Sequence, residues 1–108
     1  FVEVDDSDYI TNISMDGGEY MMETINYPWW TISAVYEKKD EDSKTIFFKE
    51  FADEYESDWY SLKIPSNKKT QLNILIDSNP SKNSRKLKID ITCGAILTFI
   101  TIIQAGNN

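Results

Sequence analysis

Arg85-Lys86-Leu87-Lys88-Ile89-Asp90-Ile91 gives the clearest strand signal in the sequence, because its residues alternate between polar and apolar. Side chains along a β-strand point to opposite faces in turn, so a period of two is typical of a strand with one buried face. The apolar members are predicted to face inward, namely Leu87, Ile89 and Ile91. The polar members are predicted to form the solvated face, namely Lys86, Lys88 and Asp90.

Two further segments carry a strand signal on either side of this stretch. Leu72-Asn73-Ile74-Leu75-Ile76-Asp77 places three apolar side chains on one face, namely Leu72, Ile74 and Ile76. Residues 97–104 are rich in β-branched side chains on both faces, which favours a central strand that is covered on both sides.

Short segments that contain Gly, Pro, Asn or Ser separate these runs, and such residues favour turns. They are Gly17-Gly18, Asn26 to Pro28, Pro65-Ser66-Asn67, Ser78-Asn79-Pro80-Ser81 and Cys93-Gly94, the last as the predicted hairpin tip between the final two strands. Frequent turns, without a long helical period or a βαβ alternation, predict an all-β fold of two antiparallel sheets. Residues 1–108 are expected to form a single domain.

Residues 44–58 have no clear period. Phe48, Phe51 and Tyr55 are spaced as on one face of a helix, which predicts a short helix or an irregular excursion. A strand over residues 44–49 explains the same segment equally well. The acidic run over residues 37–42 is expected to be a solvated loop.

Composition excludes several classes of partner. The chain has 108 residues, a net charge of −7, one cysteine and no histidine. Such an acidic chain is poorly suited to bind the phosphates of nucleic acid. The single Cys93 cannot form an internal disulfide, and it is expected to be a small packed residue. No stretch approaches the ~20 apolar residues of a membrane span.

Catalytic chemistry has little support in the residues. The absence of histidine excludes Ser-His-Asp and Cys-His arrangements and removes the commonest metal ligand. Two acids alone can hydrolyse a glycosidic bond, and the candidates are Asp53, Glu54, Glu56 and Asp58. These acids, like those of residues 5–8, lack the EF-hand pattern of a calcium loop and belong to charge runs that are usually solvated. We therefore expect no enzyme activity, no metal site and no cofactor.

An ordered set of landmarks resembles the BACON domain, a family named as Bacteroidetes-associated and carbohydrate-binding. The landmarks are Gly17-Gly18, Trp30-Thr31-Ile32-Ser33, Asp58-Trp59-Tyr60-Ser61-Leu62, Leu72 to Ile76, Asn79, Arg85 with Ile89 and Ile91, and Ile102-Ile103-Gln104-Ala105-Gly106. The resemblance covers residues 12–106. Between Trp30 and Trp59 the interval is longer and more aromatic than is usual for the family.

The resemblance implies an immunoglobulin-like antiparallel β-sandwich of about seven strands. It also implies an extracellular or cell-surface setting, as an outer-membrane lipoprotein or a secreted protein of Bacteroidetes. The partners it implies are polysaccharide or mucin glycans, or neighbouring domains of a parent protein. A role as a spacer is implied equally.

Exposed aromatic residues are the candidates for ligand contact, because the C–H face of a sugar stacks on a flat ring. Trp29 and Trp30 are adjacent, so in a strand they would point to opposite faces. The resemblance assigns Trp30 to the core, and this leaves Trp29, beside Tyr27 and Pro28, as the predicted platform.

The same alternation at Trp59-Tyr60 predicts that Trp59 faces inward and Tyr60 outward. The predicted ligand-binding residues are therefore Trp29, Tyr27 and Tyr60. The leading interpretation is a non-catalytic extracellular interaction or spacer module that contacts glycans. The alternative is a direct carbohydrate-binding module that uses these exposed aromatics.

Overall fold

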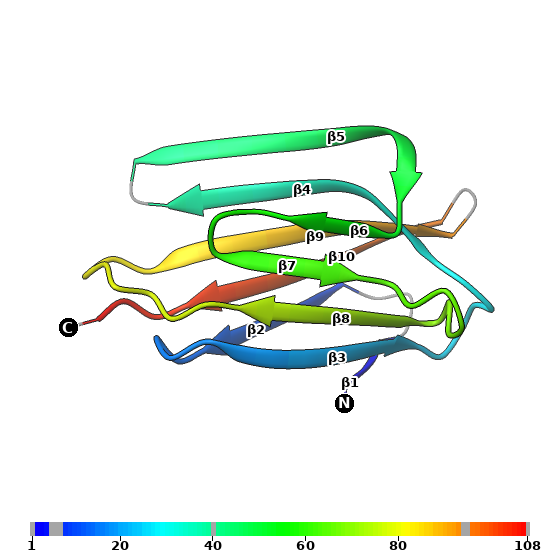
Figure 1. The fold of residues 1–108 in the computed structure, drawn as a ribbon, viewed down its shortest axis with the longest axis horizontal. Helices are drawn as coiled ribbons and strands as arrows, with labels where there is room; N and C mark the ends of the chain where they lie inside the picture. Colours follow the sequence, from blue (N-terminus) through cyan, green and yellow to red (C-terminus); the bar gives the residue numbers. More distant parts are fainter. Residues whose placement is uncertain (1, 5–7, 40, 94–95, 108) are drawn as a thin grey trace.

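Two five-stranded sheets pack face to face in the computed structural model, which describes residues 2–4, 8–39, 41–93 and 96–107 (Figure 1). Sheet A has the order β1 (Val2–Val4), β3 (Gly18–Thr24), β8 (Gln71–Ile76), β7 (Tyr60–Lys63) and β6 (Glu54–Glu56). Sheet B has the order β2 (Tyr9–Ile13), β10 (Ile96–Gln104), β9 (Arg85–Cys93), β4 (Thr31–Lys39) and β5 (Asp42–Ala52). The predicted all-β sandwich is confirmed.

The strand count and the pairing differ from the prediction of about seven antiparallel strands. Ten strands are described, and two of the pairs, β1 with β3 and β2 with β10, are parallel. Both parallel pairings arise near the N-terminus, where residues 5–8 separate β1 in sheet A from β2 in sheet B. A short segment that gives one strand to each sheet shows no local periodicity from which these pairings could be predicted.

The core lies between the two sheets and is built by the alternating strands. On β9, the side chains of Leu87, Ile89 and Ile91 are buried, as predicted. Of the predicted solvated face, Lys86 is exposed, whereas Lys88 and Asp90 are half-buried. On β8 the buried set is Leu72, Ile74 and Ile76, which also agrees with the prediction. Burying one aliphatic side chain contributes about 1.5–3 kcal/mol, so these two strands account for much of the hydrophobic stabilisation.

Strand β10 is central in sheet B, as expected, because it pairs with β9 on one side and β2 on the other. Its inward side chains, among them Ile100 and Ile102, are fully buried. The prediction that both its faces are covered holds only in part, because on the outward face Thr101 is 8% exposed whereas Leu97 is 46% exposed. The apolar outward residues therefore reflect strand propensity and not a second packed layer.

Residues 44–58, for which the sequence left a helix or a strand open, form strands and not a helix. Residues 42–52 make β5, the edge strand at the top of Figure 1, and β6 follows directly. Phe48 on β5 and Tyr55 on β6 meet edge to face, with ring centroids 5.3 Å apart. Their helix-like spacing arises because the chain crosses from one sheet to the other between them.

The predicted acidic loop is also a strand hairpin. Residues 37–39 end β4 and Asp42 begins β5, with Lys39 paired to Asp42. Charged side chains are compatible with this hairpin, because β5 is an edge strand and charge at an edge discourages pairing with a strand of another chain.

The glycine turn after β2 is confirmed. Gly17 has a φ of 76°, a left-handed conformation that favours glycine. A Cβ atom at Gly17 would also meet the backbone carbonyl of Ile76. The predicted hairpin tip at Cys93-Gly94 falls partly on residues 94–95, which lie outside the described residues.

Candidate functional site

The predicted platform residue Trp29 lies in the loop that joins β3 to β4. Its side chain is 40% exposed, whereas Trp30 and Trp59 are 3% and 5% exposed. Tyr27 in the same loop is half-buried and Pro28 is exposed. The backbone of the loop is fixed at both ends, because Ile25 N–H donates to the Val4 carbonyl and Trp30 N–H donates to the Lys69 carbonyl. Trp29 is thus an exposed aromatic ring on an anchored loop.

Trp29 and Tyr27 do not form a stacked pair in the described part of the chain. The ring contacts seen there join Phe48, Tyr55, Tyr60 and Trp59. The assignment of Trp30 and Trp59 to the core is confirmed by their burial. The role of Trp29 and Tyr27 in ligand contact remains a prediction.

The prediction that Tyr60 faces outward is wrong. Its side chain is 2% exposed and packs edge to face on Trp59, with centroids 4.9 Å apart. Trp59 precedes β7, so the alternation of side chains starts only at Tyr60 and sends Tyr60 and Leu62 inward together. A buried ring cannot stack on a sugar, and Tyr60 therefore does not belong to an exposed platform.

Tyr60 instead links the two sheets. Its hydroxyl donates to Glu37 Oε2 on β4 over 2.6 Å, and the Ser57 hydroxyl donates to the same oxygen over 3.1 Å. Burial raises the pKa of the Tyr60 phenol, and the Glu37 carboxylate raises it further. The phenol is consequently held in its neutral, hydrogen-bond-donating form.

Arg85 and Gln104 form a polar cluster at one end of the core. Arg85 Nε donates to Gln104 Oε1 over 2.7 Å, and Arg85 Nη2 donates to the carbonyls of Asp77 and Ser78. The guanidinium lies 4.2 Å from the centroid of the Trp59 ring. Burial lowers the pKa of Arg85, while the nearby Asp77 opposes this shift. These hydrogen bonds are all within the chain, so the cluster supports the fold.

Asn79 has the turn-forming role that the sequence suggests. Its Nδ2 donates to the carbonyls of Asn83 and Ala105, and its Oδ1 accepts from Ser81 N–H. The side chain is 1% exposed. Asn79 therefore ties the turn before β9 to the end of β10.

Glu54 and Glu56, two of the acids that were candidates for hydrolysis, do not face each other across a cleft. Glu54 and Glu56 lie on the same strand, opposite Lys63 and Ser61 of β7. Asp53 is 3.5 Å from Lys69 Nζ. A glycosidase needs two carboxyl groups on opposite sides of one bond, whereas Glu54 and Glu56 are two residues apart on one strand and so leave the same face of it.

Within the described residues, no group of Asp, Glu or Cys is arranged to hold a metal ion. The acids Asp5 and Asp6 lie outside those residues. No helix in the described part of the chain is long and apolar enough to cross a membrane.

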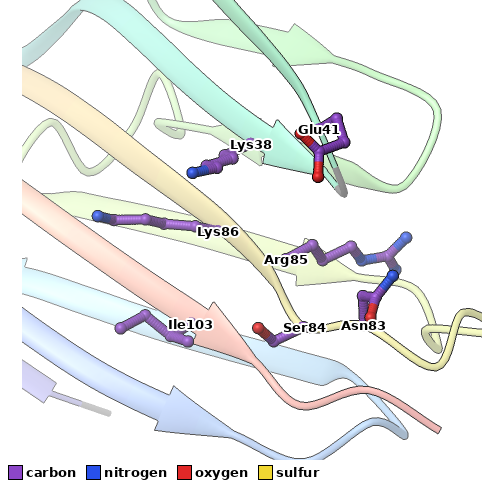
Figure 2. Close-up of a pocket in the computed structure, with 7 residues that line it drawn as sticks. All are labelled: Lys38, Glu41, Asn83, Ser84, Arg85, Lys86 and Ile103. Carbon is purple, nitrogen blue, oxygen red and sulfur yellow. The ribbon is translucent and has the colours of Figure 1, made fainter.

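A groove of about 490 Å³ opens where β4 ends and β9 begins (Figure 2). Lys38 of β4 and Lys86 of β9 line it, together with Ser84 and Ile103. Figure 2 shows the two lysine side chains extending in the same direction, while Arg85 points the other way. Lys86 was predicted only as part of a solvated face, and Lys38 was not singled out. Their proximity depends on the register of β4 against β9, which the sequence does not display.

Comparison with known proteins gives a family match and a fold match. The family model described as "BACON: Putative binding domain, N-terminal" matches residues 49–105, which is more than half of the chain. Among solved structures, the NMR structure of a protein from Bacteroides thetaiotaomicron has a TM-score of 0.77 and 21% identity. That similarity covers 94% of this chain and 79% of the other, and at this identity it shows a shared fold. No curated protein matches the chain.

Proposed function

The chain belongs to the BACON family of binding domains, and from this premise we propose that it is a non-catalytic interaction module of a bacterial cell-surface or secreted protein. Residues 1–108 act as one domain in this proposal. The module contacts glycans through the loop between β3 and β4. The observation that carries the proposal is the exposure of Trp29 on that anchored loop.

Exposure separates Trp29 from the other tryptophans. Trp29 is 40% exposed, so part of it is open to solvent, and the C–H face of a sugar ring can stack on an exposed aromatic ring. Ile25 in the same loop is also 55% exposed. The loop thus presents apolar surface to solvent without opening the core, as expected of a contact region.

Fluorescence titration tests the proposal directly. Intrinsic tryptophan emission would be followed while host and plant polysaccharides are added to the wild type and to Trp29→Ala. We expect a saturable shift that disappears in the variant. Because Trp29 is at the surface, its loss should leave the free energy of unfolding within about 0.5 kcal/mol of wild type, which urea unfolding would check.

A titration in which Trp29→Ala responds as the wild type does would contradict glycan contact at this loop. A shift in neither protein, with both folded, would favour the second candidate, a spacer between neighbouring domains.

The spacer role has one observation of its own. β1 pairs with the Met22–Thr24 end of β3, whereas β10 ends at Gln104, whose Nε2 donates to the carbonyl of Asp77. Asp77 follows Ile76, and Ile76 pairs with Gly18 at the other end of β3. The first strand, β1, therefore lies toward the Thr24 end of β3, and the last strand, β10, ends toward the Gly18 end. Such an arrangement suits domains that are joined head to tail.

A further inference from the structure

We propose that the groove between β4 and β9 binds the acidic groups of a carboxylated or sulfated polysaccharide, with Lys38 and Lys86 as the charge contacts. The choice of polysaccharide rests on the proposed glycan contact. The choice of an anionic group rests on the groove itself.

The strand register places the two lysines together. Lys38 pairs directly with Lys86 across β4 and β9, so both side chains leave the same face of sheet B. Like charges directly opposite each other in an antiparallel pair are destabilising. An anion between the two ammonium groups would remove that repulsion, which makes the pair a natural anion contact.

Neither lysine forms an ion pair within the described residues. The ion pairs seen there are Lys68 with Glu23 and Lys69 with Asp53, at the opposite end of the sandwich. Arg85, the next cation along β9, is turned into the core and donates to Gln104. Arg85 also lines the groove, but its Nε and Nη2 donate within the chain. Lys38 and Lys86 are therefore the cations best placed to meet an anion there, in a chain whose net charge is −7.

The remaining lining suits an acidic sugar. Ile103 of β10 pairs with Lys86 and supplies an apolar surface beside the charge. Ser84 offers a hydroxyl at the start of β9. The volume of about 490 Å³ lies within the range of small-ligand sites. Glu41 also lines the groove, and its carboxylate opposes an anion, so affinity is limited by this one residue.

The two lysines of the groove favour an acidic polysaccharide over a nucleic acid. Two lysines present point charges on flexible stems and lack the fork of arginine. They suit a single carboxylate or sulfate, whereas a nucleic-acid backbone needs a track of basic residues. The groove is also distinct from the Trp29 loop, because Thr31 and Lys38 lie about 23 Å apart along β4.

The test is an NMR titration of the ¹⁵N-labelled protein with polygalacturonate, chondroitin sulfate, dextran and inorganic phosphate. Both acidic polymers should shift the amides around Lys38 and Lys86, and dextran should not. Raising the salt from 50 to 500 mM should weaken the shifts, because exposed charges are screened. Lys38→Gln/Lys86→Gln should weaken binding about tenfold, since each exposed charge contact contributes modestly.

Two variants make the result specific. Lys68→Gln/Lys69→Gln removes the same charge elsewhere and should retain the wild-type affinity for the acidic polymers. Glu41→Gln should tighten binding severalfold. Equal weakening in both double variants would overturn the proposal, because it would show a general charge effect. Phosphate binding as tight as polymer binding would overturn the choice of polysaccharide.

The two proposals fail separately. If only Trp29→Ala alters the titrations, the groove is not a site and the loop proposal stands. If only Lys38→Gln/Lys86→Gln alters them, the groove stands and the loop proposal fails.

Discussion

Arg85 illustrates at the scale of one residue why a charged side chain can be part of a core. It is 4% exposed, yet its guanidinium has acceptors in Gln104, Asp77 and Ser78 and rests on the Trp59 ring. A buried charge is costly unless it is hydrogen-bonded. These acceptors explain how an arginine can be accommodated at this end of the core.

Replacement of Arg85 by Ala should destabilise the fold. Gln104 Oε1 would lose its donor inside the core, and leaving a buried polar group unpaired costs about 1–3 kcal/mol. With the lost packing on Trp59, we expect the free energy of unfolding to fall by about 3 kcal/mol. Lys86→Ala is the matched control, since this exposed neighbour should cost less than about 0.5 kcal/mol. Urea unfolding measures both, and similar losses would contradict the role assigned to Arg85.

Strand β5 raises a different question at the scale of the element, because a long edge strand can pair with other chains. Phe47 points outward opposite Ala34 and is 77% exposed, whereas the neighbouring Phe48 packs against the core and Tyr55. Lys44 and Lys49 flank this apolar run. Such charges are a known means of discouraging edge-to-edge association.

The two phenylalanines should respond differently to the same substitution. Phe47→Ala removes little buried surface, so we expect less than about 0.5 kcal/mol of destabilisation and less turbidity on heating. Phe48→Ala should lower the free energy of unfolding by about 2 kcal/mol, since a half-buried ring loses part of the usual core contribution. Equal losses in urea unfolding would show that the alternation along β5 does not hold.

The contact between Tyr60 and Glu37 belongs to the whole molecule, because it joins β7 of sheet A to β4 of sheet B. The rest of the inter-sheet contact is dominated by apolar side chains, which carry no charge to titrate. The Tyr60 phenol is therefore a group through which high pH can act on the packing of the two sheets.

Stability should fall at alkaline pH through Tyr60. Its folded pKa lies above the ordinary value of 10.0, so the native state holds the proton more tightly than the unfolded chain does. This contribution is complete below pH 10 and is lost as the pH rises toward the folded pKa. Between pH 9 and pH 11 the wild type should lose about 1 kcal/mol more than Tyr60→Phe.

Urea unfolding at the two pH values provides the measurement, with Tyr27→Phe as a control for a tyrosine in the loop. Equal losses in the wild type and in Tyr60→Phe would mean that the phenol ionises as freely in the folded state as in the unfolded chain. Such a result would argue against the hydrogen bond to Glu37.

The site could be predicted only in part, and the two pairs of adjacent aromatic residues, Trp29-Trp30 and Trp59-Tyr60, show why. At residues 29 and 30 the expected division into exposed and buried rings is correct, although both residues precede β4. At residues 59 and 60 the same logic fails, because β7 begins at Tyr60 and not before Trp59. Element boundaries are set by tertiary contacts, and a shift of one residue exchanges the inward and outward faces.

By itself, the sequence determined the strands whose apolar and polar residues alternate, the turns that separate them and the two-layer packing that such strands require. Period-two burial is a local property, and β8 and β9 could be assigned from it. The tertiary structure decided the parallel pairings of β1 and β2, the burial of Tyr60 and the meeting of Lys38 with Lys86. Each of these depends on which strands become neighbours and in what register, and that choice is made by contacts between residues far apart in the chain.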